Sequence, residues 1–405
     1  MKHGKFLLAL LPAFLLLASD WTEWRGPKRD GTVTVEPSPW PAKLRKQWEI
    51  TVGEGHSSPL FAGGSIYQFA RMDAQEVVVA LDPATGKERW KQKYAAPYSV
   101  NVAAFKHGAG PKSTPVYAGG KLYTLGISGI VSSFDAETGK VRWRKDFASQ
   151  FKQTSPSFGV AMSPVVDNGM LLVHVGGDGN GALMALDAAT GATKWSWNED
   201  GPAYASPIVA DLGGVRQVVT QTQHNIVGLA EASGKLLWKI PFTTAHEQNN
   251  VTPLIYKDTL ILSGLDKGTM AVRLAHTGDQ WTPQTIWQTK DASMYMSSPV
   301  LSGDLLFGFS HLKKGQLFCL DAASGAVKWL GSPRQGENAA LLVSPTSLIA
   351  MLNDGELVIA KASGNGFEET HRYTVAENPV WAHPLVMADG VVIKDVKTLA
   401  RWVAQ

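Results

Sequence analysis

One stretch of the chain recurs, and this recurrence restricts the fold more than any other feature. Residues 79–90 form an alternating apolar run, a tight turn containing Asp82 and Gly86, and a second run that ends in Trp90. Similar stretches end at Trp143, Trp195, Trp238 and Trp329, and weaker copies carry their closing aromatic at Trp287 and Tyr373. The length of 405 residues could hold two or three ordinary domains, but the repeat favours one array of stacked units.

The repeated residues have simple physical roles. Asp at the start of the turn can accept hydrogen bonds from backbone amides two or three residues later, and Gly adopts positive φ without strain. A Trp four residues after the Gly would bury its ring against the neighbouring unit. We therefore expect structural roles for Asp82, Gly86, Trp90, Asp135, Gly139, Trp143, Asp187, Gly191, Trp195, Trp238 and Trp329.

A second marker, a hydroxyl residue followed by Pro, recurs between the turns. It occurs at Ser58, Thr114, Ser163, Ser206, Thr252, Ser298 and Ser344, and His383-Pro384 is an eighth copy, with intervals of 39 to 56 residues. Proline has no amide donor for a β-ladder, so it suits the first residue of a strand. Each interval holds about four short runs of alternating apolar residues, and no amphipathic helix is evident.

Eight four-stranded units predict an all-β, eight-bladed β-propeller of antiparallel blades. The run around Trp48 is one strand in excess at the start, whereas the last unit lacks one strand. Pairing of Trp48 with the strand near Arg401–Val403 would close the ring and remove exposed edges. We assign residues 40–405 to the propeller and residues 20–39 to an extended segment packed on it by its aromatic residues.

The N-terminus has the order of a secretory signal peptide. Lys2 and Lys5 precede an apolar run from Phe6 to Ala18, which is too short to span a bilayer comfortably. We assign residues 1–19 to a signal peptide cleaved near Ala18 or Ser19, with an uncleaved anchor as the alternative. No Cys follows the run, so no lipid-acceptor site is expected, and the location is periplasmic or secreted.

Composition excludes several classes of function. Formal net charge is +3 and Lys and Arg are not clustered, so no nucleic-acid footprint is evident. The single cysteine, Cys319, excludes an intramolecular disulfide and a Cys-based zinc site, and its apolar surroundings predict a buried thiol. Asp178 starts a stretch like a calcium loop, but Ala189 stands where that loop needs Glu.

The repeat resembles that of pyrroloquinoline-quinone (PQQ) dehydrogenases and their relatives. Ala80, Asp82, Thr85, Gly86 and Trp90 match its pattern, and the resemblance covers nearly all of residues 40–405. It implies the propeller fold but does not settle activity, because the matched residues belong to turns and packing. The quinoprotein dehydrogenases have a calcium site, an Asp base and often a vicinal disulfide. No motif in this sequence identifies residues for any of these features. The chain also resembles the non-catalytic propeller of the outer-membrane β-barrel assembly machinery, which acts as a scaffold.

The segments before the Pro markers should converge on one mouth of the central channel. They contribute the candidate binding residues His56, Lys112, Tyr204, Glu247, Asn249, Asn250, Tyr295, Trp381 and His383. A concave site with amides, aromatic rings and imidazoles would suit a polar ligand or a peptide. The alternative is that these groups bond one another and ordered water inside the channel.

These observations favour an exported, monomeric, non-enzymatic scaffold that binds an envelope protein or peptide partner, or a small polar ligand. No catalytic residue, metal site or cofactor is expected. The alternative is a PQQ-dependent dehydrogenase that oxidises an alcohol or sugar with PQQ and calcium. A calcium–quinone constellation would distinguish the two, and the sequence offers no motif for one.

Overall fold

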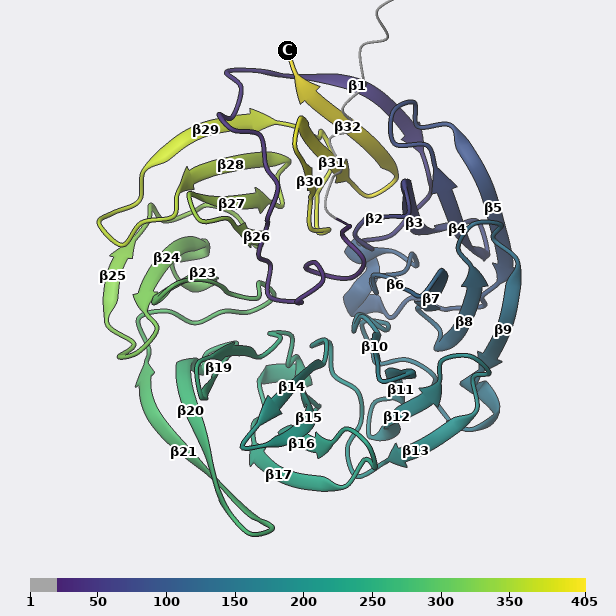
Figure 1. Cartoon of the computed structure of the whole chain (residues 1–405), viewed down its shortest axis with the longest axis vertical. Coiled ribbons are helices and arrows are strands. Elements are labelled where there is room, and N and C mark those ends of the chain that lie inside the picture. Colours follow the sequence, from purple (N-terminus) through teal and green to yellow (C-terminus); the bar gives the residue numbers. More distant parts are fainter. Residues whose placement is uncertain (1–19) are drawn as a thin grey trace, which may run out of the picture.

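The computed structural model describes residues 20–405, whose strands form eight four-stranded antiparallel sheets arranged as blades around a central axis (Figure 1). The predicted eight-bladed propeller is therefore confirmed. The predicted signal peptide, residues 1–19, lies outside the described residues. Within residues 20–405, no helix is long and apolar enough to cross a membrane.

The first four blades follow the chain in order, each from an inner to an outer strand. Blade 1 comprises β2 (Leu60–Ala62), β3 (Ser65–Met72), β4 (Gln75–Leu81) and β5 (Glu88–Ala95). Blade 2 comprises β6 (Val116–Ala118), β7 (Lys121–Leu125), β8 (Ile130–Asp135) and β9 (Val141–Asp146). Blade 3 comprises β10 (Val165–Asp167), β11 (Met170–Gly177), β12 (Asn180–Asp187) and β13 (Thr193–Trp197). Blade 4 comprises β14 (Ile208–Leu212), β15 (Val215–Gln221), β16 (Asn225–Ala230) and β17 (Leu236–Pro241).

The remaining blades complete the ring. Blade 5 comprises β18 (Leu254–Tyr256), β19 (Thr259–Gly264), β20 (Gly268–Thr277) and β21 (Gln280–Thr289). Blade 6 comprises β22 (Val300–Ser302), β23 (Leu305–Ser310), β24 (Gln316–Asp321) and β25 (Val327–Leu330). Blade 7 comprises β26 (Ala339–Val343), β27 (Ser347–Leu352), β28 (Glu356–Lys361) and β29 (Glu369–Thr374). Blade 8 combines β30 (Leu385–Met387), β31 (Gly390–Lys394) and β32 (Thr398–Ala404) with β1 (Leu44–Thr51).

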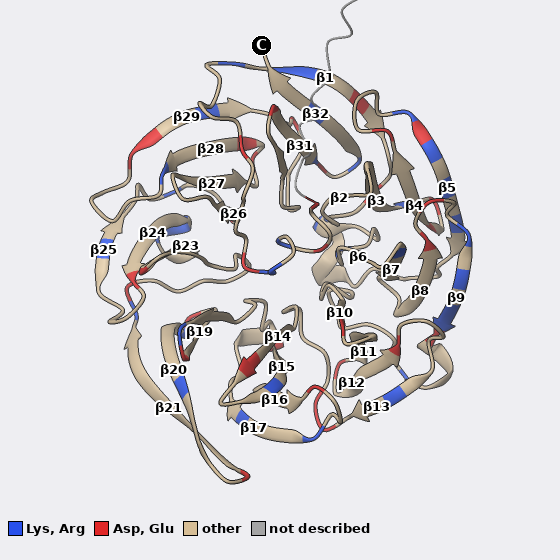
Figure 2. Ribbon diagram, viewed as in Figure 1, with Lys and Arg blue, Asp and Glu red and all other residues tan. Residues whose placement is uncertain are grey.

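Strand β1 closes the ring as predicted. It pairs antiparallel with β32, and Trp48 lies opposite Arg401 in the register. The first and last strands therefore share one sheet, and every blade has four strands. Charged residues lie mainly along the outermost strands, such as β1, β5 and β9, whereas the inner strands carry few (Figure 2).

Seven of the eight blade junctions are clasped by an aromatic side chain. Trp90 illustrates the arrangement: its indole Nε1–H donates to the carbonyl of Ala136 in the next blade (2.9 Å). Its ring covers Gly139, where an added Cβ would lie 2.6 Å from ring carbons. Trp48, Trp143, Trp195, Trp287 and Trp329 donate in the same way to Pro83, Ala188, Glu231, Ala322 and Ser363, and the Tyr373 hydroxyl donates to Pro41.

Blade 4 departs from this arrangement. The Nε1–H of Trp238 donates to Gln217 of its own blade at 2.7 Å, and its ring lies over Gly228. Blade 5 instead extends a long hairpin, β20–β21, outside the ring (Figure 1). At its end, His276 stacks on Trp281, with 4.4 Å between ring centroids, and both rings lie against Gly213 of blade 4.

A segment from Trp21 to Val33 enters the central channel, where it tethers several blades. Arg29 is 5% exposed, pairs with Glu23 at 2.7 Å, and donates to the carbonyls of Ser163, Pro164 and Pro207. Arg25 is fully buried and donates to the carbonyl of Pro299. These carbonyls lie just before the inner strands of blades 3, 4 and 6, so the segment fills one end of the channel and joins distant blades.

The placement of one predicted marker is wrong. Ser344-Pro345 does not precede the first strand of its blade, because β26 already ends at Val343 and Ser344 lies in the turn to β27. The strand register places Ala340 at the equivalent position of this blade, two residues before Leu342. A serine–proline pair in a turn looks the same in sequence as one at a strand start.

Candidate functional site

A cavity of about 920 Å³ opens at the channel mouth where the loops between blades converge. Of the nine residues predicted for this mouth, the structure brings together seven at its wall: His56, Lys112, Tyr204, Asn250, Tyr295, Trp381 and His383. Glu247 and Asn249 lie in the same loop set but do not line the cavity. Their role in binding stays a prediction.

A circle of hydroxyl groups forms the inner part of this cavity. The amides of six marker residues each donate to the side-chain oxygen of the equivalent residue in the next blade, at 2.9–3.1 Å. The order runs from His383 to Ser58, Thr114, Ser163, Ser206, Thr252 and Ser298. The hydroxyl is required because each inner strand begins with an amide that has no strand partner on the channel side. Ala340 of blade 7 has no such oxygen, so the circle is interrupted between blades 6 and 8.

One wall of the cavity is built from imidazole and indole rings. His107 lies edge-on to Trp381, with ring centroids 4.9 Å apart, and His56 contacts both rings. Burial, followed by the nearby charge of Lys112, lowers the pKa of His56 to about 3 and that of His107 to about 4. Both imidazoles are therefore neutral at pH 7, so these rings add no charge to the mouth.

His383 lies at the base of the cavity. It is 8% exposed, and its Nε2 has no hydrogen-bond partner among the described residues. Its ring packs in a T-shaped arrangement with that of Trp24 in the channel segment, with 5.5 Å between the ring centroids. Burial, followed by the charge of Arg25, lowers its pKa to about 3, so it presents a neutral imidazole nitrogen to the interior.

Four cationic side chains line the cavity: Lys106, Lys112, Lys314 and Arg334. The lining of the cavity contains one carboxylate, Glu337, and Lys106 pairs with it at 2.8 Å across the mouth. Lys112 is largely buried and donates to the carbonyl of Phe158, and burial lowers its pKa to about 8. The mouth is therefore positive at neutral pH.

The two tyrosines hold loops on the opposite wall. The Tyr204 hydroxyl accepts from the amide of Phe158 at 3.2 Å, and Tyr295 donates to the side-chain oxygen of Gln248. Burial raises the pKa of both hydroxyl groups, so both stay protonated at neutral pH. Asn250 follows Gln248 by two residues in the same loop and also lines the cavity.

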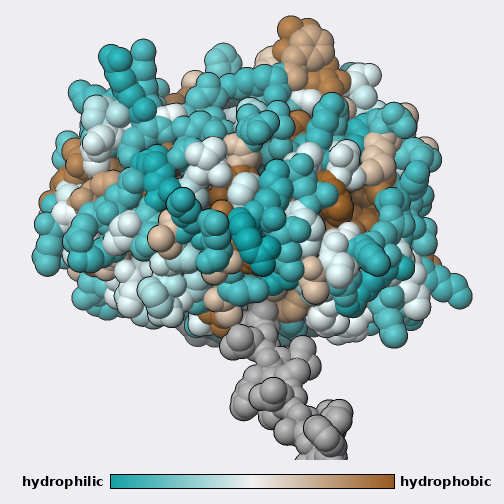
Figure 3. Space-filling model, turned by 90° about the horizontal axis from the view of Figure 1, so that it is seen from above, coloured by the Kyte–Doolittle hydropathy of each residue, from teal (hydrophilic) through white to brown (hydrophobic). Residues whose placement is uncertain are grey.

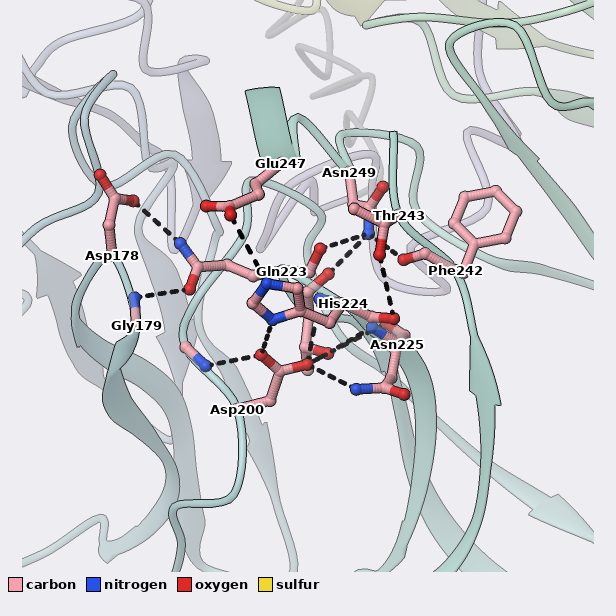
Figure 4. Close-up of polar contacts among 12 residues, drawn as sticks. Asp178, Gly179, Asp200, Gln223, His224, Asn225, Phe242, Thr243, Glu247 and Asn249 are labelled. Atoms are coloured by element: carbon pink, nitrogen blue, oxygen red, sulfur yellow. Dashed lines mark hydrogen bonds and ion pairs between the residues drawn. The ribbon is translucent and has the colours of Figure 1, made fainter. Parts of the chain in front are cut away.

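Glu247 and Asn249 belong to a separate polar network beside the cavity (Figure 4). Asn249 is fully buried and donates to the carbonyls of Thr222, Gln223 and Phe242. Glu247 lies 3.5 Å from Nε2 of His224, whose Nδ1 lies 2.8 Å from Asp200. Since these two residues bond protein groups, this part of the mouth matches the alternative of internal satisfaction.

The 3-10 helix η1 (Val102–His107) is a part of the mouth that sequence reasoning missed. It contributes Ala103, Lys106 and His107 to the cavity, while Val102 and Phe105 are 78% and 67% exposed. A group of hydrophobic side chains projects from one face of the molecule (Figure 3). The segment has neither strand periodicity nor a marker, so its proximity to Pro115 in sequence is the only signal that could have located it.

Two features bear on the dehydrogenase alternative. Among residues 20–405, no group of three or more His, Cys, Asp or Glu side chains is placed to hold a metal ion. The cavity lining offers four cations and one paired carboxylate, whereas calcium takes carboxylate and carbonyl oxygens. The lining therefore does not fit a calcium–quinone site.

Cys319 is buried, as expected, and burial raises the pKa of its thiol to about 12.

The fold and repeat define the chain as an eight-bladed propeller of the PQQ-repeat class. Residues 73–331, more than half of the chain, match the protein family described as outer membrane protein assembly factor BamB, and the chain belongs to this family.

Individual relatives agree with this assignment. The outer membrane protein assembly factor BamB of Yersinia pestis is 28% identical over 52% of this chain and 52% of its own length. That of Moranella endobia is 23% identical over 98% of this chain and 89% of its own length. The chain thus spans about half of the Yersinia relative and most of the Moranella one.

Solved structures share the fold at low identity. The BamB structure from Moraxella catarrhalis aligns with a TM-score of 0.62 and 15% identity over 89% of this chain and all of that one. The quinohemoprotein alcohol dehydrogenase of Comamonas testosteroni aligns with a TM-score of 0.68 and 15% identity, over 95% of this chain and 80% of that one. At such identities the likeness shows the architecture alone.

Proposed function

We propose that this chain is a non-enzymatic scaffold of the cell envelope that binds a partner protein at the channel mouth and contributes to the assembly of outer-membrane proteins. The family match over residues 73–331 carries the proposal, because the relatives are named as assembly factors. The mouth supports it physically: two exposed apolar side chains, Val102 and Phe105, stand beside a large open cavity.

The proposal includes export of the chain with cleavage of residues 1–19, a monomeric state and no resident cofactor. A scaffold needs a rigid body with a preformed recognition surface, which the closed ring supplies. The mouth loops are held by the hydroxyl circle and by Tyr204 and Tyr295, so little ordering would be needed when a partner binds.

The direct test is deletion of the gene in its own organism, with outer-membrane β-barrel proteins quantified in envelope fractions. We expect reduced amounts of these proteins and recovery on complementation with the wild-type chain. A doubly substituted chain, Val102→Ser with Phe105→Ser, should complement poorly. A chain with Val327→Ser, at an exposed position on the outer strand β25, should complement fully. Unchanged outer-membrane proteins in the deletion strain would contradict the proposal.

A second assay addresses the dehydrogenase alternative. The purified chain, supplied with PQQ and calcium, should reduce no electron-acceptor dye in the presence of alcohols or sugars. Calcium-dependent dye reduction that is abolished by Glu337→Gln, at the one carboxylate of the cavity lining, would overturn the scaffold proposal.

A further inference from the structure

We infer that the cavity binds an acidic segment of a partner protein, with carboxylates facing the cations of the mouth and an apolar side chain packed on Val102 and Phe105. This inference rests on the proposed function, since it names the chemistry of the partner at the same mouth.

The first observation is the charge of the mouth. Lys112, Lys314 and Arg334 line the cavity without an ion-pair partner among the described residues, and Lys106 compensates the one carboxylate, Glu337. Lys112 is more buried than Lys314 and Arg334, which are exposed, so water screens its charge less than theirs. A ligand with carboxylates would therefore gain charge-assisted hydrogen bonds that no group of the described chain supplies.

The second observation is an unsatisfied polar atom at the base of the cavity. Nε2 of His383 is buried and has no hydrogen-bond partner among the described residues. Buried polar groups in folded proteins are nearly always hydrogen-bonded. An incoming peptide group or carboxyl could supply the partner, so the polarity of the cavity continues to its base.

The third observation distinguishes a protein segment from a small anion. Val102 and Phe105 stand on η1 at the entrance and are among the most exposed large apolar side chains of residues 20–405. A small anion held inside the cavity would leave them in water. A segment that runs over η1 before it enters the mouth would cover their apolar area and use both features together.

The test is binding of a short fluorescein-labelled peptide of alternating Glu and Phe, measured by fluorescence anisotropy with the full chain. One matched peptide has Gln in place of Glu, and another has Ser in place of Phe. We expect the acidic peptide to bind about tenfold more tightly than either, and more weakly as salt rises. Equal affinity for the Glu and Gln peptides would overturn the inference.

Two neighbouring lysines provide a matched pair of variants. Lys313 and Lys314 are both exposed and both have left-handed φ, 56° and 64°, but only Lys314 lines the cavity. Charge reversal should therefore perturb the backbone equally in both. Lys314→Glu, alone or with Arg334→Glu, should lower the affinity for the acidic peptide several-fold. Lys313→Glu should have a markedly smaller effect, and equal effects would overturn the inference.

The outcomes separate this inference from the proposed function. If deletion of the gene reduces outer-membrane proteins but acidic peptides do not bind, the scaffold stands and the acidic ligand is wrong. If deletion has no effect, the proposed function fails whatever the peptides do. Thermal melts of each variant show whether a loss of binding reflects a loss of folding.

Discussion

The junction between blades 1 and 2 and the junction between blades 4 and 5 solve the same packing problem differently. At the first, Trp90 reaches across to the Ala136 carbonyl and covers Gly139. At the second, Trp238 turns back onto its own sheet, and nothing lies within 4 Å of a Cβ added at Gly278.

One residue explains why Trp238 differs. Strand positions opposite the other tryptophans hold Ala or a larger residue, such as Ala80 opposite Trp90. Blade 4 has Gly228 there, and a Cβ added to it would lie 2.2 Å from the Trp238 ring. The missing methyl group makes room for the ring on its own sheet, where Gln217 accepts its N–H. The comparison shows that a repeat can keep its Trp and still lose the clasp.

The largest expected effect is loss of a clasp. Trp195→Ala should lower the free energy of unfolding by about 3–5 kcal/mol, because it removes a buried ring between blades 3 and 4 and leaves a cavity. Trp195→Phe retains part of the ring but loses the hydrogen bond to Glu231, so its cost should be smaller. Urea denaturation measures both. A cost for Trp195→Ala below about 1 kcal/mol, as for a surface change, would show that the clasp does not hold the blades.

The turn glycines sharpen the comparison directly. Gly139→Ala combines a left-handed φ of 73° with overlap against the Trp90 ring, so it should cost about 2–4 kcal/mol. Gly278→Ala has a similar φ of 56° but open space, so it should cost about 1–2 kcal/mol, from backbone strain alone. The difference between the two free energies isolates the ring contact. Equal costs would mean that the Trp90 ring can move away from the new methyl group without a loss of stability.

Stability should also depend on pH beside blade 4, where Asp200, in the connection from blade 3, pairs with His224 on the β15–β16 hairpin. The hydrogen bond to Asp200 raises the pKa of His224, with burial opposing and the charge of Glu247 adding to it. Burial alone would raise the pKa of Asp200, but hydrogen bonds from Thr222, His224 and Asn225 lower it overall.

The signs of these shifts define a window. The contribution of His224 is present below its ordinary pKa of 6.5 and is lost as pH rises through its value in the folded protein. The contribution of Asp200 is present above its ordinary pKa of 3.8 and is lost as pH falls. Relative to His224→Gln, the wild type should therefore gain most stability between these two values. Denaturation of both at a series of pH values tests this, and a constant difference would exclude the ion pair as its source.

The fold could be predicted from the sequence because its information is local and repeated. Asp82, Gly86 and Trp90 each act within one turn or on the next blade, so their spacing reports the architecture. The closure of β1 onto β32 followed from counting strands. The serine–proline pair at Ser344 misled because a two-residue motif does not distinguish a strand start from a turn.

The candidate site could be predicted only in part. The marker loops had to meet at the channel mouth, and seven of the nine chosen residues line the cavity. Whether a side chain faces the cavity or the surrounding loops depends on backbone geometry, which the sequence pattern does not reveal. Asn249, for example, turns away from the cavity and donates to the carbonyl of Thr222. Lys314 and Arg334 were missed because they lie on a hairpin turn and a loop without marker residues, and only the folded ring brings them to the mouth.

The smallest effect tests whether blade 4 can be made regular. In blades 1, 2, 3 and 6 the turn Asp accepts from backbone amides two or three residues later, as Asp187 does from Thr190 at 3.0 Å. Blade 4 has Ala230 at this position, so the turn lacks these bonds. Ala230→Asp should therefore raise the free energy of unfolding by about 0.5–1 kcal/mol, the net value of a hydrogen bond. In blade 3, Lys194 forms an ion pair with Asp187. Blade 4 has Leu237 at the position of Lys194, so the new Asp should gain no ion pair.

Asp187→Ala is the matched control and should lower the free energy of unfolding by a similar amount. A gain at position 230 without a loss at 187 would mean that the Asp contributes through something other than the turn.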